Sequence, residues 1–143
     1  MTPGAVVRRF FDLAADGDTE GMLELIDPDV VWFGTRGGVD AHRVVRGSDA
    51  FLRYLEEIEA TWEQFEAEVE RLIESDETVV AFLRETARGR GGLDVQNETA
   101  VIFKIREERI IEAQGYLDRD EALEAARLRE QLGSRNGSDC RIE

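Results

Sequence analysis

Two adjacent charged residues in an apolar segment are the strongest chemical candidates in this sequence. Arg84 and Glu85 lie within the run FLRETA, residues 82–87, which has the composition of a strand. Consecutive strand residues point to opposite faces, so only one of the two can point inward. An inward arginine could bind a carboxylate or polarise an oxygen, whereas an inward glutamate could have a raised pKa and act as a base. The competing interpretation pairs Arg84 with a glutamate on the neighbouring strand.

Two further residues have side chains suited to acid–base chemistry. His42 is the single histidine and lies in the glycine-rich segment 34–47, where Asp40 could orient it as a general base. The alternative is an exposed loop histidine. Tyr54 follows Phe51 by three residues on a predicted helix, so its hydroxyl could point inward. The alternative for Tyr54 is a half-buried position at a surface edge.

The cysteine and histidine counts argue against metal chemistry. Cys140 is the one cysteine and His42 the one histidine, so neither an internal disulfide nor a multi-cysteine metal site can form. Zinc and non-haem iron sites normally use more imidazole than this chain has. We therefore expect no metal and no cofactor.

Length and charge limit the class of protein. The chain has 143 residues, which predicts one domain, assigned to residues 1–132, with a polar and disordered tail over 133–143. The net charge of −14 disfavours nucleic acids and anionic membranes as partners. The apolar runs are too short to span a bilayer, and the N-terminus lacks the shape of a secretory signal. We expect a cytoplasmic protein.

Helical spacing and capping residues predict three helices in the first half of the chain. Thr2 and Pro3 are typical of an N-cap and the first helical position. Asp18 is predicted to cap a second helix, which Pro28 stops, and Ser48 to cap a third. The third helix has its apolar stripe at Phe51, Leu52, Leu55, Ile58 and Trp62.

Four strands and a final helix are predicted for the second half, after one early strand at 30–33. The first of the four has Phe65, Ala67, Val69 and Ile73 on one face and Glu66, Glu68, Glu70 and Glu74 on the other. The others are residues 79–88, 95–106 and 109–117, the last two joined by a hairpin at Glu107 and Glu108. Asp118 is predicted to cap the last helix, with Glu121 as its capping-box partner. Helices followed by antiparallel strands indicate an α+β fold.

The segments FFDLAADGDTEGMLELI, DPDVVWF, RGSDAFLRYL and ERIIEAQGYLDRDEALEAA occur in an order that resembles the nuclear transport factor 2-like superfamily. The SnoaL-like, polyketide-cyclase-like branch is the most similar. The resemblance covers about residues 3–128. It implies a cone-shaped sheet, antiparallel or mixed, wrapped around N-terminal helices, an apolar cavity, and a homodimer through the outer sheet face. Because the superfamily contains isomerases, hydrolases, cyclases and non-catalytic modules, the fold does not fix the function.

The resemblance also implies where catalytic groups would lie, and those positions lack them. The base carboxylate of isomerase-like members falls at Gly34, their acidic donor near Ala100 and their helix tyrosine at Phe10. The aspartate of epoxide-hydrolase-like members falls at Gly115, and their tyrosine at Trp32. Trp32 is then either a pocket wall or a core residue.

The sequence therefore predicts a protein that binds a small hydrophobic molecule, with or without cofactor-free acid–base catalysis of an isomerase, cyclase or hydrolase type. The candidate catalytic residues are Arg84, Glu85 and His42. The expected pocket residues are Phe10, Trp32, Gly34, Tyr54, Phe82, Phe103, Gly115 and Leu117. The alternative is a non-catalytic interaction or dimerisation module with a vestigial cavity.

Overall fold

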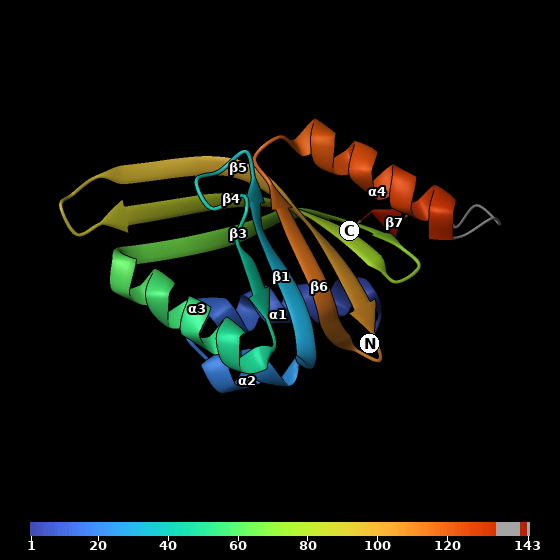
Figure 1. Cartoon of the computed structure of the whole chain (residues 1–143), viewed down its shortest axis with the longest axis horizontal. Coiled ribbons are helices and arrows are strands. Elements are labelled where there is room, and N and C mark those ends of the chain that lie inside the picture. The colour runs from blue at the N-terminus through green and yellow to red at the C-terminus, as the bar shows by residue number, and fades with distance from the viewer. Residues whose placement is uncertain (134–140, 143) are drawn as a thin grey trace.

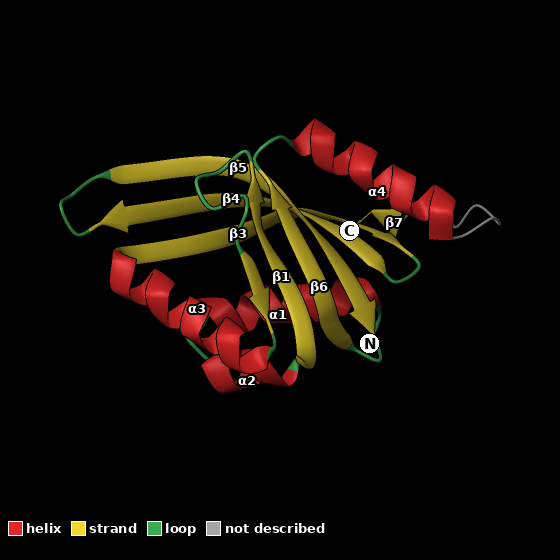
Figure 2. Ribbon diagram, viewed as in Figure 1, coloured by secondary structure: helices red, strands yellow, loops and turns green. Residues whose placement is uncertain are grey.

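The computed structural model describes residues 1–133 and 141–142, which form an α+β fold around one curved, open sheet (Figures 1 and 2). The helices are α1 (Pro3–Ala15), α2 (Thr19–Glu24), α3 (Ser48–Thr61) and α4 (Arg119–Gly133). The strands are β1 (Ile26–Arg36), β2 (Val44–Arg46), β3 (Trp62–Ser75), β4 (Thr78–Gly89), β5 (Asp94–Arg106), β6 (Arg109–Tyr116) and β7 (Arg141–Ile142). The strand order is β2-β1-β6-β5-β4-β3-β7, with β1 and β6 parallel and the other pairs antiparallel. The predicted fold class is confirmed; most of the tail expected to be disordered lies outside the described residues.

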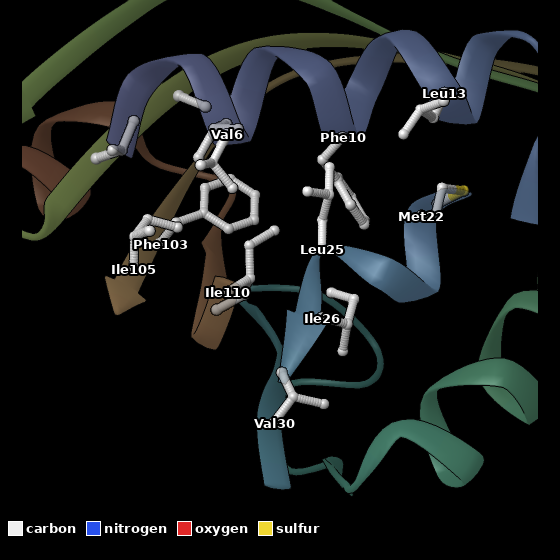
Figure 3. Close-up of a cluster of buried hydrophobic side chains, with 14 of the residues drawn as sticks. Val6, Phe10, Leu13, Met22, Leu25, Ile26, Val30, Phe103, Ile105 and Ile110 are labelled. Atoms are coloured by element: carbon white, nitrogen blue, oxygen red, sulfur yellow. The ribbon is translucent and has the colours of Figure 1, made fainter. Parts of the chain in front are cut away.

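The sheet has two differently covered faces. The inner face carries α1 and α3, and its core includes Val6, Phe10, Phe51 and Phe103. Figure 3 shows side chains of α1 pointing toward those of β5, β6 and β1. The outer face carries α4 over a second cluster, which consists of Val80, Phe82, Ala100, Ile102, Tyr116 and Ala122. Figure 1 shows the strands bending around α1, so the inner face is concave.

The first two helices begin at the predicted caps. Thr2 Oγ1 accepts a hydrogen bond from the amide of Ala5 at 3.1 Å, and Asp18 Oδ1 accepts one from Gly21 at 2.9 Å. Each cap satisfies an amide that has no partner within its helix, so the helix can start there. These starts place Phe10 in the core of the inner face.

Two predicted boundaries are wrong. Helix α2 already ends at Glu24, so Pro28 is not the residue that stops it. Pro28 lies within β1, where its missing amide interrupts no helix. Ser48 is the first residue of α3 rather than its cap. The cap is Gly47, whose φ of 87° lies in the left-handed region that glycine tolerates.

The predicted face pattern of β3 is also wrong at its C-terminal end. A register shift between Val69 and Arg71 leaves Glu70 as an extra residue in the strand. Such a bulge exchanges the faces of all later residues. Ile73 therefore packs into the outer-face cluster, while Glu74 is buried instead of exposed.

The segment 34–47 contains more strand than the glycine content predicts. Strand β1 continues to Arg36, and β2 pairs with β1 through Val44–Phe33 and Val45–Trp32. The β5–β6 hairpin turns at Glu107 and Glu108 as predicted, both with positive φ. None of the helices described is long and apolar enough to cross a membrane.

Asp118 precedes helix α4 and caps it, because its Oδ1 accepts hydrogen bonds from the amides of Asp120 at 2.9 Å and Glu121 at 3.2 Å. The predicted capping role of Asp118 is confirmed. Glu121 has a different role from the one expected, because its carboxylate pairs with Arg36 Nε at 3.2 Å. The pair joins the first turn of α4 to the end of β1.

Candidate functional site

The structure separates Arg84 and Glu85 by face. Arg84 lies on the outer face, 46% exposed, and pairs with Glu70 at 3.2 Å. This is the cross-strand ion pair that the sequence left open as the alternative. Glu85 lies on the inner face and is half-buried. Only Glu85 is therefore positioned to act on a molecule at the inner face.

Thr99 of β5 holds one oxygen of Glu85. Its hydroxyl donates a hydrogen bond to Glu85 Oε1 at 3.0 Å, and Thr99 is itself buried. Sequence analysis missed Thr99, because the contact depends on the β4–β5 register, which pairs Leu83 with Thr99 and Glu85 with Asn97. Thr99 thus lies diagonally across from Glu85 on the same face.

The surroundings of Glu85 and Tyr54 disfavour ionisation of both. Burial raises the pKa of Glu85, the hydrogen bond from Thr99 opposes that rise, and the charge of Asp40 adds to it. Burial also raises the pKa of Tyr54, with Asp40 and Glu85 adding to the rise and Arg43 opposing it. These effects place Asp40 and Tyr54 within electrostatic reach of Glu85. We call Asp40, Tyr54, Glu85 and Thr99 the inner-face site.

Tyr54 is fixed from both sides. The centroid of its ring lies 6.3 Å from that of Phe51. The Arg43 guanidinium lies 5.1 Å from the Tyr54 centroid and also forms an ion pair of 2.7 Å with Glu57. The stacking restricts the Tyr54 ring without using its hydroxyl. The hydroxyl is therefore available as a hydrogen-bond donor.

The two glycines where the resemblance places catalytic side chains have no room for a side chain. A Cβ at Gly34 would lie 1.8 Å from the main-chain oxygen of Asp40, and Gly34 N donates to Arg43 O at 2.8 Å. A Cβ at Gly115 would lie 2.8 Å from Thr35 Oγ1. The chain's own loop and Thr35 thus occupy the space that a carboxylate would need.

Aromatic rings fill the adjoining core. Trp32 lies 4.8 Å from Phe51 and 5.8 Å from Phe103, and Phe10 lies 5.9 Å from Trp32, all measured between ring centroids. These spacings are those of packed aromatic pairs. Trp32, Phe10 and Phe103 therefore lie together on the inner face and contact one another, and their expected place in a ligand pocket stays a prediction.

Three other expected residues lie elsewhere. Phe82 belongs to the outer-face cluster, between the guanidiniums of Arg71 and Arg119, so its expected place in a pocket wall is wrong. Leu117 follows the end of β6 and is 40% exposed. Ala100 also points outward, which means that it cannot hold the position of an inward acidic donor.

His42 is exposed in the turn before β2. Within the described part of the chain no hydrogen bond or ion pair joins His42 to Asp40, whose charge instead raises the pKa of Tyr54 and of Glu85, so the role of His42 as a base stays a prediction. Among the described residues, no group of three His, Cys, Asp or Glu side chains could hold a metal ion.

A surface hollow of about 410 Å³ is lined by Gln64, Glu66, Thr86, Arg88, Asp94, Val95 and Gln96. Arg88 and Asp94 form an ion pair of 3.0 Å within it. Thr86 and Arg88 alternate with Glu85 along β4, so the hollow is on the outer face and separate from the inner-face site.

A curved sheet around α1, with α3 beside it, defines the nuclear transport factor 2-like fold. The SnoaL-like domain family matches residues 7–113, and the chain belongs to that family. No curated protein matches the sequence.

Solved structures show the same fold at low sequence identity. An NTF2-like protein from Burkholderia thailandensis is 19% identical, with a TM-score of 0.75 over 88% of this chain and 98% of that one. TerC co-crystallised with polyporic acid is 18% identical, with a TM-score of 0.72 over 86% and 97%. Rv0760c from Mycobacterium tuberculosis, in complex with estradiol-17beta-hemisuccinate, is 17% identical, with a TM-score of 0.70 over 84% and 97%.

Proposed function

We propose that this protein binds a small hydrophobic molecule at the inner-face site, with Glu85 as the acid–base group. The observation that carries the proposal is the half-buried Glu85 carboxyl, which is held by Thr99 and whose charge helps to raise the pKa of Tyr54. Apolar residues surround it on the same face: Ala67 lies opposite Glu85, Phe65 opposite Ala87. Phe65 is 41% exposed, so this end of the face is open to a ligand.

The chemistry would be proton transfer without a cofactor. A carboxyl whose pKa is raised by burial is a better proton donor and acceptor near neutral pH than an exposed one. Tyr54 would donate a hydrogen bond to an oxygen of the ligand. An isomerase, cyclase or hydrolase type of reaction uses these two roles. The complexes of Rv0760c with estradiol-17beta-hemisuccinate and of TerC with polyporic acid support a small molecule as the partner.

A non-catalytic interaction module is the second candidate. The packed rings of Phe10, Trp32, Phe51 and Phe103 and the loop over Gly34 favour it, because they fill space that a deep cavity would use. In either case we propose a cytoplasmic homodimer. Since α4 covers Phe82 and Tyr116, a second copy would contact the uncovered part of the outer face.

A thermal-shift screen against hydrophobic acids, terpenoids and polyketide-like aromatic compounds tests the ligand proposal. We expect at least one compound to raise the Tm of the wild-type protein and to lose most of that effect in Tyr54→Phe and Glu85→Gln. The exposed outer-face variant Glu68→Gln is the matched control. A broad panel without a single stabiliser would favour the interaction module instead. Sedimentation of the full chain tests the dimer, and a monomer at high concentration would exclude it.

A further inference from the structure

The inner-face site has an acidic character that its immediate neighbours do not neutralise. The register places Ala67 and Asn97 opposite Glu85, with Leu83 and Ala87 two residues away on the same strand. None of these four side chains carries a charge. Within the part of the chain that the structure describes, no ion pair joins Glu85 to a basic residue.

The basic side chain that stacks on Tyr54 is already engaged. Arg43 pairs with Glu57 at 2.7 Å and stacks over the Tyr54 ring at 5.1 Å. Asp40 is the charged group that raises the pKa of both Tyr54 and Glu85. The charges of Asp40 and Glu85 therefore both act on the Tyr54 phenol, and the arginine that stacks on Tyr54 is held by a third carboxylate, that of Glu57.

Glu85 has unused hydrogen-bonding capacity. Thr99 donates to Oε1, and the second oxygen receives no hydrogen bond from a described side chain. A carboxylate in that position accepts from a donor and repels a second carboxylate. Phe65 and Ala87 lie beside it and offer apolar area to the rest of a ligand.

We propose that the inner-face site selects apolar molecules that carry a hydrogen-bond donor, amines above all, and rejects the matching carboxylic acids. The proposal rests on the function proposed above and adds the class of head group. An ammonium group would pair with Glu85 and lie within the field of Asp40. A carboxylate on the same apolar skeleton would face two like charges, which costs several-fold to hundred-fold in affinity.

Three compounds with one ring system separate head group from skeleton: 1-naphthylmethylamine, 1-naphthalenemethanol and 1-naphthoic acid. Titration calorimetry at pH 8 and physiological salt measures the Kd and stoichiometry of each with the full chain. We expect the amine to bind with one-to-one stoichiometry at least about tenfold more tightly than the acid, with the alcohol between them. In Glu85→Gln the ratio of the Kd of the acid to the Kd of the amine should fall to about threefold or less, and in Glu68→Gln this ratio should stay as in the wild type. Both variants are first checked by circular dichroism and thermal unfolding.

The outcomes distinguish the two proposals. An acid that binds as tightly as the amine overturns the head-group selectivity and leaves ligand binding at this site standing. Amine selectivity that survives in Glu85→Gln also overturns it, because the negative surface rather than the site then attracts the amine. If none of the three compounds binds, the proposed ligand-binding function fails and the selectivity with it. If Glu85→Gln does not fold, a second measurement uses the wild-type protein. The amine is titrated while NMR follows the backbone amide signals of Asn97 and Thr99. Signals that do not move overturn the proposal.

Discussion

The main-chain oxygen of Asp40 occupies the space that a side chain at residue 34 would fill, 1.8 Å from the position of a Cβ on Gly34. The contact fixes the segment before β2 across the end of β1, where Gly34 N also bonds to Arg43 O. Glycine is therefore required here by packing. The same segment supplies Asp40 and Arg43, which act on Tyr54.

Gly34→Ala should destabilise the protein strongly, because the methyl group meets backbone that cannot rotate away. We expect a loss of about 2 kcal/mol or more, a fall in Tm of roughly 6–10 °C. Gly91→Ala is the matched control, since a Cβ there has nothing within 4 Å. Differential scanning calorimetry compares them. Equal Tm values for the two variants would show that the segment around Asp40 can move aside without loss of stability.

Glu85→Gln should stabilise the protein at neutral pH. Burial raises the pKa of Glu85, so the folded state favours the protonated carboxyl. The wild type therefore loses stability as pH rises from the ordinary carboxyl range through the raised pKa, and the neutral amide does not. We expect a Tm gain of about 2–4 °C at pH 7–8, shrinking toward pH 4. The control Glu68→Gln removes the same charge from the outer face and should show no such pH-dependent gain; matching curves would contradict the prediction.

Thr99→Val should raise the pKa of Glu85 further. The Thr99 hydroxyl donates to Glu85 Oε1 and thereby favours the ionised carboxylate, while valine has a similar shape and no donor. A carbon-detected NMR titration of the Glu85 carboxyl measures the shift directly. Thr86→Val, an exposed threonine on the outer side of the same strand as Glu85, is the control. An unchanged titration midpoint in Thr99→Val would mean that the hydrogen bond does not persist in solution.

Arg119→Ala should weaken the attachment of α4. The Arg119 guanidinium is 27% exposed, pairs with Glu70 at 2.6 Å and donates to the main-chain oxygens of Leu83 at 2.9 Å and Thr99 at 3.2 Å. Removing the guanidinium takes a hydrogen-bond donor from the Glu70 carboxylate and from both main-chain oxygens, which should lower the free energy of unfolding by about 2–3 kcal/mol.

Arg84→Ala provides the comparison, because Arg84 binds the same Glu70 but is more exposed. We expect it to cost less than about 1 kcal/mol in urea unfolding. If the two arginines cost the same, the contacts of Arg119 with the strand carbonyls do not contribute to stability.

The sequence by itself determined most of the helices and the long strands, but not β2 or the full length of β1. The caps Thr2, Asp18 and Asp118 and the Glu107–Glu108 turn are local, and the structure agrees with each. Local propensity and pattern act over a few residues, so they can be deduced from the chain in order. The family and fold followed from the order of these segments.

Tertiary structure decided which side chains meet. The bulge at Glu70 reversed the faces of Ile73 and Glu74, and Phe82 lay under Arg119 on the outer face rather than in a pocket wall. Whether Arg84 or Glu85 points inward, and that Thr99 holds Glu85, depends on strand register, where one residue of shift exchanges the two faces. Contacts between residues far apart in the chain, such as the hydrogen bond from Arg119 to the main-chain oxygen of Leu83, arise only when the strands have paired and α4 has packed on the sheet.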